Sequence, residues 1–146
     1  AVDVSEFAVE CARENAARNG LSQVVDCVAA NVFDLLPQLQ KGQYDFIILD
    51  PPAFTKSRQT TQRAMAGYKE INYRAMRLLP RGGYLATCSC SHFATEELFR
   101  KMLHAAAHDA GVQLRQIEAR QQSADHPILW GVEETSYLKF YLFQVV

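Results

Sequence analysis

The run YDFIILD at residues 44–50 contains no polar residue between its two aspartates. A strand with so little polarity is typical of the middle of a parallel sheet, where both faces of the strand are buried. Parallel neighbours in a sheet need crossover connections, which are usually helices. The run therefore indicates an α/β fold, in which ligands bind at the carboxyl ends of the strands.

The rest of the chain alternates between helix-like and strand-like segments, as this fold requires. Apolar residues recur with helical spacing in three segments, 5–19, 68–79 and 94–110. Strand-like runs occupy 1–4, 24–30, 84–89, 112–119 and 136–146. The last two runs have no helix between them, so we expect a mostly parallel, doubly wound sheet that ends in an antiparallel strand pair. The segment 51–67 reads as a polar loop, and 32–39 as a short helix or turn.

The composition fits one globular domain of 146 residues, 49% of them hydrophobic. A formal net charge of −1 excludes a domain that is basic overall, although a local basic face stays open. No apolar run approaches the roughly 18 residues of a membrane span, and we expect no signal peptide. Four unevenly spaced cysteines do not indicate a disulfide scaffold. We therefore expect a protein of the reducing cytoplasm, with no membrane partner.

Two polar residues follow the first strand-like runs. Asp3 can accept hydrogen bonds from the two hydroxyls of a ribose, as acidic residues do in dinucleotide folds. Its alternative role is to interact with the positive end of the following helix. Asn31 can reach the edge of an adenine or can cap a helix at 32–39. Neither residue alone distinguishes between these interpretations.

The motif DPPAF at 50–54 is more informative. Asp50 ends the apolar strand, which holds its carboxylate at the rim of the predicted site. Pro51 and Pro52 have no backbone N–H and a restricted φ, so the loop is stiff and its carbonyls are free to accept hydrogen bonds. Phe54 can pack against a flat ring. An ordinary turn is the alternative, but two prolines directly after such a strand favour a binding site.

Cys88 and Cys90 are separated by one serine in the segment ATCSCSHF. If the strand ends near Cys88, then Cys90 lies in the turn before the next helix, where amide groups stabilise a thiolate. A thiolate is the form that attacks a substrate. The alternative for Cys90 is a small buried apolar residue. A metal site that includes His92 is not expected, because this tight spacing does not match structural zinc patterns.

Basic residues gather in the loop and helix that follow DPPAF: Lys56, Arg58, Arg63, Lys69, Arg74, Arg77 and Arg81. Aromatic residues at 54, 68 and 73 lie among them. Such a segment can be a solvated helix face, or it can meet the phosphates and bases of RNA.

Taken together, these motifs resemble a known family. The matching stretches run from end to end: VDVS (2–5), ILDPPAF (48–54), GYKEIN (67–72), CSCS (88–91), ELFRKML (97–103), SADHP (123–127) and YLKF (137–140). The chain resembles the bacterial 23S rRNA cytosine-5 methyltransferases that carry an N-terminal PUA domain. These belong to the Rossmann-like class I methyltransferases, which use S-adenosylmethionine. The combination of DPP and SCS, joined by the GYKEIN helix, is the specific part of the match.

The resemblance implies roles for individual residues. It implies cofactor contacts from three strand ends: Asp3, Val4, Asn31, Val32, Asp50 and Pro51. It implies contacts to 23S rRNA from the loop and helix after them: Pro52, Phe54, Lys56, Tyr68 and Lys69. In related RNA cytosine-5 enzymes, a nucleophilic cysteine follows a Gly-Gly strand start within a Thr/Ser-Cys-Ser pattern. Counted from Gly82-Gly83, Cys90 has that position, so it is the expected nucleophile, with Asp50 assisting it and Cys88 as the alternative.

The chain also departs from the family pattern. The first strand, the glycine-rich cofactor loop and the PUA domain are expected upstream of Ala1, so residues 1–146 are predicted to be part of a catalytic domain that is inactive alone. Ala53 stands where some of these enzymes have a second cysteine that assists product release. Two other functions stay open: a methyltransferase that modifies an exocyclic amino group, and a fragment of this fold that binds RNA without catalysis. A homodimer is compatible with the sequence.

Overall fold

The computed structural model describes residues 1–55 and 57–146, with the side chain of Arg58 also left out. The chain divides into two compact units, Ala1–Leu39 and Gln40–Val146. Each unit is described separately below.

The larger unit is a four-stranded sheet with two long helices. Its elements follow in the order β3 (Phe46–Leu49), η2 (Arg58–Thr60), α3 (Thr61–Leu78), β4 (Tyr84–Ser89), α4 (Glu96–Ala110), β5 (Leu114–Arg120), η3 (Glu133–Thr135) and β6 (Lys139–Val145). The strand order is β3-β4-β6-β5, with β3 and β4 parallel. Strand β6 is antiparallel to both β4 and β5, which confirms the predicted antiparallel pair at the end of the chain.

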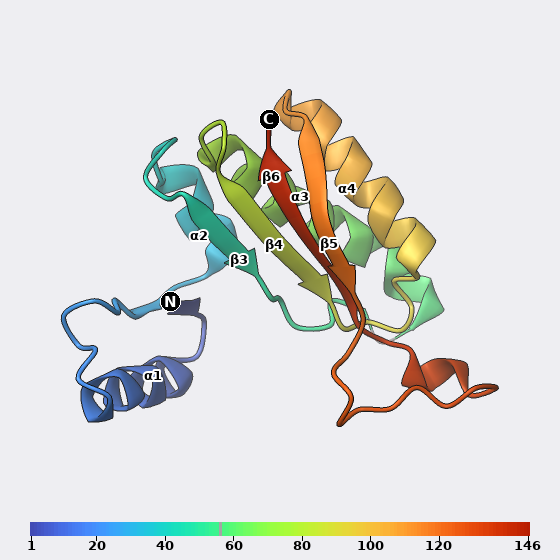
Figure 1. The fold of residues 1–146 in the computed structure, drawn as a ribbon, viewed down its shortest axis with the longest axis horizontal. Helices are drawn as coiled ribbons and strands as arrows, with labels where there is room; N and C mark the ends of the chain where they lie inside the picture. The colour runs from blue at the N-terminus through green and yellow to red at the C-terminus, as the bar shows by residue number, and fades with distance from the viewer. Residues whose placement is uncertain (56) are drawn as a thin grey trace. The chain divides into compact units, whose positions relative to one another are not determined.

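Helices α3 and α4 lie on the same face of this sheet (Figure 1). Alternate residues of β6 point toward them, and Tyr141, Phe143 and Val145 are buried there. The strand register places Leu85 of β4 opposite Phe143, so it belongs to the same covered face. Tyr68 of α3 and Phe99 of α4 meet edge-on, with ring centroids 5.7 Å apart, and both are fully buried. These residues form the core of the larger unit.

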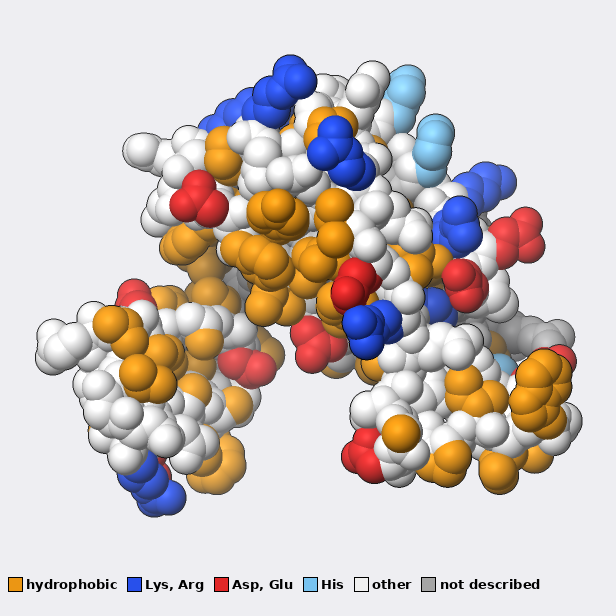
Figure 2. Space-filling model, in the orientation of Figure 1, with side chains coloured by type: hydrophobic (Ala, Val, Ile, Leu, Met, Phe, Trp, Pro, Cys, Tyr) orange, Lys and Arg blue, Asp and Glu red, His pale blue; other side chains and the backbone are white. Residues whose placement is uncertain are grey.

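The opposite face of the sheet is open. On β3 the side chains of Phe46 and Ile48 are 50% and 67% exposed, and Figure 2 shows apolar side chains gathered on this side of the molecule. The prediction that β3 is buried on both faces is therefore wrong for the described residues. The physical reason is the position of β3 at the edge of the four-stranded sheet, with α3 and α4 on one side alone.

Helix α3 begins at Thr61, seven residues earlier than the predicted start at 68. Its first turns bury Ala64 before the stripe of Tyr68, Ile71 and Ala75, so the spacing of buried residues is helical from the start. The segment 51–67 is thus only partly a loop. In α4 the buried residues are Phe99, Met102, Leu103 and Ala106, whereas Leu98 is 39% exposed. None of the helices in the described residues is long and apolar enough to cross a membrane.

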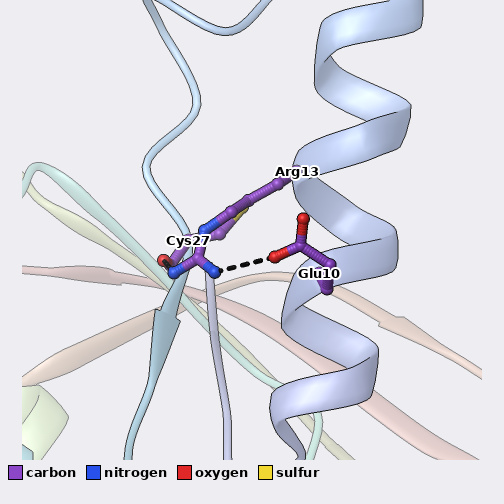
Figure 3. Close-up of polar contacts among 3 residues, drawn as sticks. All are labelled: Glu10, Arg13 and Cys27. Carbon is purple, nitrogen blue, oxygen red and sulfur yellow. Dashed lines mark hydrogen bonds and ion pairs between the residues drawn. The ribbon is translucent and has the colours of Figure 1, made fainter.

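The smaller unit contains β1 (Val2–Asp3), α1 (Glu6–Arg18), β2 (Val28–Ala29), α2 (Val32–Leu35) and η1 (Leu36–Gln38). Strands β1 and β2 are parallel. Ser5 caps α1, with its Oγ accepting from the Ala8 amide at 3.2 Å. Figure 3 shows Arg13 of α1 reaching the segment before β2, where it donates to the Cys27 carbonyl at 2.8 Å and pairs with Glu10 at 3.1 Å.

The apolar stripe predicted for α1 is only partly buried, with Ala8, Cys11 and Ala12 half-buried. Ala16 is the buried residue of this stripe, and Phe7 is among the exposed large side chains. Val9, which lies outside the stripe, is also buried. The smaller unit therefore has a small core of its own.

Candidate functional site

The two cysteines of the CSCS segment (88–91) have different backbone settings. Cys88 is paired with Phe140 inside the β4–β6 ladder. Strand β4 ends at Ser89, so Cys90 lies in the turn that leads to α4, whose N-cap is Thr95. This is the arrangement predicted for a strand that ends near Cys88. Both thiols are free and half-buried.

Hydrogen bonds tie this turn to the loop that follows β3. The hydroxyl of Ser91 donates to the Thr55 carbonyl at 3.1 Å, and both residues are buried. Thr55 in turn donates through Oγ1 to the Ser57 carbonyl at 2.6 Å. The DPPAF loop and the Cys90 turn are thereby held together at the carboxyl ends of β3 and β4.

Tyr68 supports the same loop from α3. Its ring packs against Phe54, with centroids 4.6 Å apart, and its hydroxyl accepts from the Phe54 amide at 3.5 Å. Burial raises the pKa of the Tyr68 hydroxyl, although a hydrogen bond to Ser89 acts in the opposite direction. Tyr68 therefore links the loop after β3 with the end of β4.

The electrostatic setting of Cys88 is unfavourable for a thiolate. Burial, followed by the negative charges of Asp50 and Cys90, raises the pKa of the Cys88 thiol to about 11. Asp50 itself is exposed directly after β3, beyond the pairing of Leu49 with Thr87. Its charge therefore acts on Cys88, the residue after Thr87, and disfavours ionisation there. This setting favours Cys90 over Cys88 as the reactive thiol.

The residues predicted to contact the cofactor in the smaller unit, Asp3, Val4, Asn31 and Val32, lie at the ends of β1 and β2. One oxygen of the Asp3 carboxylate accepts from the Ser5 amide at 2.8 Å. Asn31 caps α2 through its Oδ1, which accepts from the Phe33 amide at 3.0 Å. Among the described contacts, Oδ2 of Asp3 and the amide nitrogen of Asn31 have no other partner. An acceptor at Asp3 and a donor at Asn31 thus remain available to a ligand.

The predicted substrate contacts are distributed unevenly. Pro52 is exposed and Phe54 is half-buried at the loop. Tyr68 is fully buried, and Lys69 pairs with Asp109 of α4 at 2.6 Å. Lys56 lies outside the described residues. The structure therefore brings Asp50, Pro51, Pro52, Phe54 and Tyr68 to the same strand ends as Cys90, and it directs Lys69 toward α4.

Other predicted features are engaged in local contacts. Of the basic residues after DPPAF, Arg74 pairs with Glu70 at 2.7 Å, and Arg77 donates to the Tyr73 hydroxyl at 3.0 Å. The part of the chain that the structure describes contains no cluster of three His, Cys, Asp or Glu residues that could hold a metal ion.

One residue of the site was not expected from the sequence. Lys139, the first residue of β6, is paired with Ser89, and its ammonium group donates to the carbonyls of Ser91 at 2.6 Å and Tyr137 at 2.7 Å. The alternation of side chains along the strand could have shown this, because residues 139, 141, 143 and 145 share one face. Tyr141, Phe143 and Val145 on that face are apolar, so position 139 is expected to be buried as well. A lysine at a buried position of such a strand indicates a specific role.

Comparison with known proteins gives a family match and several relatives. Residues 1–113 match the model of the methyltransferase small domain family. Proteins named ribosomal RNA large subunit methyltransferase I are 40% identical in Klebsiella pneumoniae (strain 342) and 45% identical in Shewanella amazonensis. These alignments cover 99% and 94% of this chain, but 37% and 36% of the relatives. The chain therefore spans little more than a third of the length of these proteins.

Solved structures agree on the fold. A putative methyltransferase complexed with SAH superposes with a TM-score of 0.77 at 19% identity, over 99% of this chain and 38% of that protein. TrmN from Thermus thermophilus gives a TM-score of 0.65 at 22% identity, over 99% and 35%. These matches confirm the predicted Rossmann-like class I methyltransferase fold. The relatives' names confirm the predicted resemblance to bacterial large-subunit rRNA methyltransferases.

Proposed function

Since the chain belongs to the methyltransferase small domain family, we propose that it is the catalytic part of an S-adenosylmethionine-dependent enzyme that methylates carbon 5 of a cytosine in 23S ribosomal RNA. The observation that carries this proposal is the position of Cys90. It follows the last residue of β4, outside the ladder, in a turn bound to the DPPAF loop through Ser91 and Thr55. The names of the relatives support an rRNA substrate.

The proposed role of Cys90 is to make carbon 5 of cytosine nucleophilic enough to take a methyl group. Carbon 5 is a weak nucleophile, and addition of the Cys90 thiolate to carbon 6 makes it enamine-like. After carbon 5 has gained the methyl group, loss of its proton returns the electron pair toward carbon 6 and breaks the Cys90–carbon bond, which regenerates the thiolate. Asp50 can hydrogen-bond the cytosine edge during these steps. The target base must leave its stack to reach the thiol.

Within the smaller unit, the side chains at the ends of β1 and β2 suit S-adenosylmethionine, which supplies the methyl group when bound. The free oxygen of Asp3 suits ribose hydroxyls, and the free amide nitrogen of Asn31 suits an acceptor on the adenine edge. Val4 and Val32 offer apolar contact beside them. Asp50 and Pro51 would border the methyl donor. Pro52, Phe54, Lys56, Tyr68 and Lys69 remain the predicted contacts to RNA.

The predicted domain organisation stays a prediction. It includes a first strand, a glycine-rich loop and a PUA domain upstream of Ala1. Because the chain spans little more than a third of its relatives, the activity is proposed for a protein that contains those parts. A cytoplasmic location and a homodimer are likewise predictions.

Covalent trapping tests the proposal. RNA that contains 5-fluorocytosine keeps fluorine where the leaving proton would be, so the cysteine adduct cannot be resolved. We expect the protein with its upstream parts, incubated with S-adenosylmethionine and such RNA, to form a stable adduct visible as a shifted band. Cys90→Ala should abolish the adduct, and Cys88→Ala, the matched control, should retain it.

Three results would contradict the proposal. An adduct that survives Cys90→Ala but not Cys88→Ala would move the nucleophile to Cys88. Full methyl transfer by Cys90→Ala would instead support the amino-group methyltransferase, since that chemistry needs no cysteine. Absence of S-adenosylmethionine binding by the complete protein, measured by calorimetry, would support an RNA-binding role without catalysis.

A further inference from the structure

Lys139 is a buried cation on an otherwise apolar strand face. Its side chain is 7% exposed, and the buried residues that follow it on the same face are Tyr141, Phe143 and Val145. Within the described residues, no carboxylate lies within 4.0 Å of its ammonium group to form an ion pair. A buried ammonium without a counterion is costly, because water is replaced by a medium that solvates charge poorly. The position therefore calls for an explanation beyond packing.

The contacts of Lys139 bracket Cys90 on both sides. Its backbone pairs with Ser89, and its ammonium group donates to the carbonyl of Ser91. A second bond, to the Tyr137 carbonyl, fixes the direction of the side chain. The cation is thus held against the turn that carries the Cys90 thiol.

Few other charges surround this ammonium group. Glu96 of α4 and Arg120 of β5 line the same hollow as Lys139, which has a volume of about 300 Å³. Glu96 accepts from the Tyr141 hydroxyl at 2.7 Å, and Arg120 pairs with Glu118 at 2.9 Å. Burial lowers the pKa of Lys139 to about 8, while negative charge on Cys90, and then on Glu96, acts to raise it. Electrostatics thus couples the cation to Cys90.

On the premise of the function proposed above, we propose that Lys139 is a positioning residue that holds the Cys90 turn in place and stabilises the Cys90 thiolate by its positive charge. The thiol proton passes to solvent, and the charge left on sulfur faces the ammonium group. Two residues earlier, burial and Asp50 act against ionisation of Cys88. The site would then select one of two neighbouring cysteines by burial and charge together.

The pH dependence follows from the same groups. Below about pH 8 the ammonium group is charged and supports the Cys90 thiolate. Above that pH the support weakens as Lys139 loses its proton. The carboxylate of Glu96 acts to raise the pKa of Lys139, which helps to keep the ammonium group charged.

The test is the rate of alkylation of Cys90 by iodoacetamide between pH 5.5 and 10, without RNA or S-adenosylmethionine. Peptide mass spectrometry reads Cys90 and Cys88 separately in one sample. We expect Lys139→Met to slow the alkylation of Cys90 about 10-fold at pH 7, because the thiolate loses the support of the cation. Lys139→Arg should stay within about 2-fold of the parent.

Lys139→Gln separates charge from hydrogen bonding, since it can still donate to the two carbonyls. It should slow alkylation as Lys139→Met does, and it serves as the second variant if Lys139→Met does not fold by circular dichroism. Parent-like alkylation of Cys90 in folded Lys139→Gln would overturn the proposal. Because no substrate is used, this outcome is distinguishable from a failure to form the covalent RNA adduct.

Discussion

The helix-covered face and the open face of the four-stranded sheet carry similar apolar side chains and bury them very differently. Leu85 of β4, on the covered face, is fully buried, whereas Ile48 of β3, on the open face, is 67% exposed. Both belong to strands with almost no polar residues in their centres. Strand composition thus predicts that a strand suits burial, but it does not say which face is covered.

A similar difference in burial separates Cys88 from Ser89, its neighbour in β4. Ser89 and its partner Lys139 are buried on the covered side, next to the Cys90 turn. Cys88 and its partner Phe140 are only half-buried on the other side. Adjacent residues of one strand therefore meet different surroundings, whereas the Cys90 thiol lies in the turn beyond the end of β4.

The largest expected effect tests the burial contrast directly. Leu85→Ala should lower the free energy of unfolding by about 2–5 kcal/mol, because it leaves a cavity in the covered core. Ile48→Ala is the matched control on the open face, where we expect about 0.5 kcal/mol or less. Urea unfolding followed by circular dichroism measures both. Equal losses would mean that the open face is covered in solution.

A smaller effect is expected at the bond between the Cys90 turn and the DPPAF loop. Ser91→Ala should cost about 1–3 kcal/mol, because the buried Thr55 carbonyl loses its donor. Ser136→Ala, whose hydroxyl makes no hydrogen bond among the described contacts, should be neutral in the same urea experiment. If Ser91→Ala is equally neutral, the turn and the loop are not held by this bond.

The smallest effect concerns Cys88. Asp50→Asn removes a negative charge that raises the pKa of this thiol, so the pKa should fall from about 11 by less than one unit. Alkylation of the Cys88 peptide across pH 8–11 measures the shift. Burial, the larger cause, is unchanged by the substitution. An upward shift would show that the carboxylate does not act on Cys88 as described.

Much of the fold follows from local signals in the sequence. Residues 84–89 form β4 with the predicted bounds, and α1 begins after Ser5, because caps and strand runs are decided by neighbouring residues. The start of α3 was missed because a polar run and Gly67 conceal the helical spacing that begins at Ala64. The exposure of β3 could not be predicted, since it depends on which elements cover each face.

In the candidate site, the motifs at the strand ends could be recognised from the sequence. The charges that act on the two thiols could not be predicted from it. The position of Cys90 after β4 follows from counting along the strand. The high pKa of Cys88 depends on burial and on Asp50 from another strand, and the role of Lys139 depends on a pairing 50 residues away in the chain. Such long-range pairings are visible only in the folded molecule.

The order of strands also bears on how the protein is made. Strand β6 lies between β4 and β5 although it is the last of the six along the chain (Figure 1). The turn that carries Cys90 therefore acquires its lysine partner only after the ribosome has released residues 139–145. A nascent chain that stops short of them would have its thiol without its cation, so the reactive form of the cysteine would appear only after residues 139–145 have been made and paired.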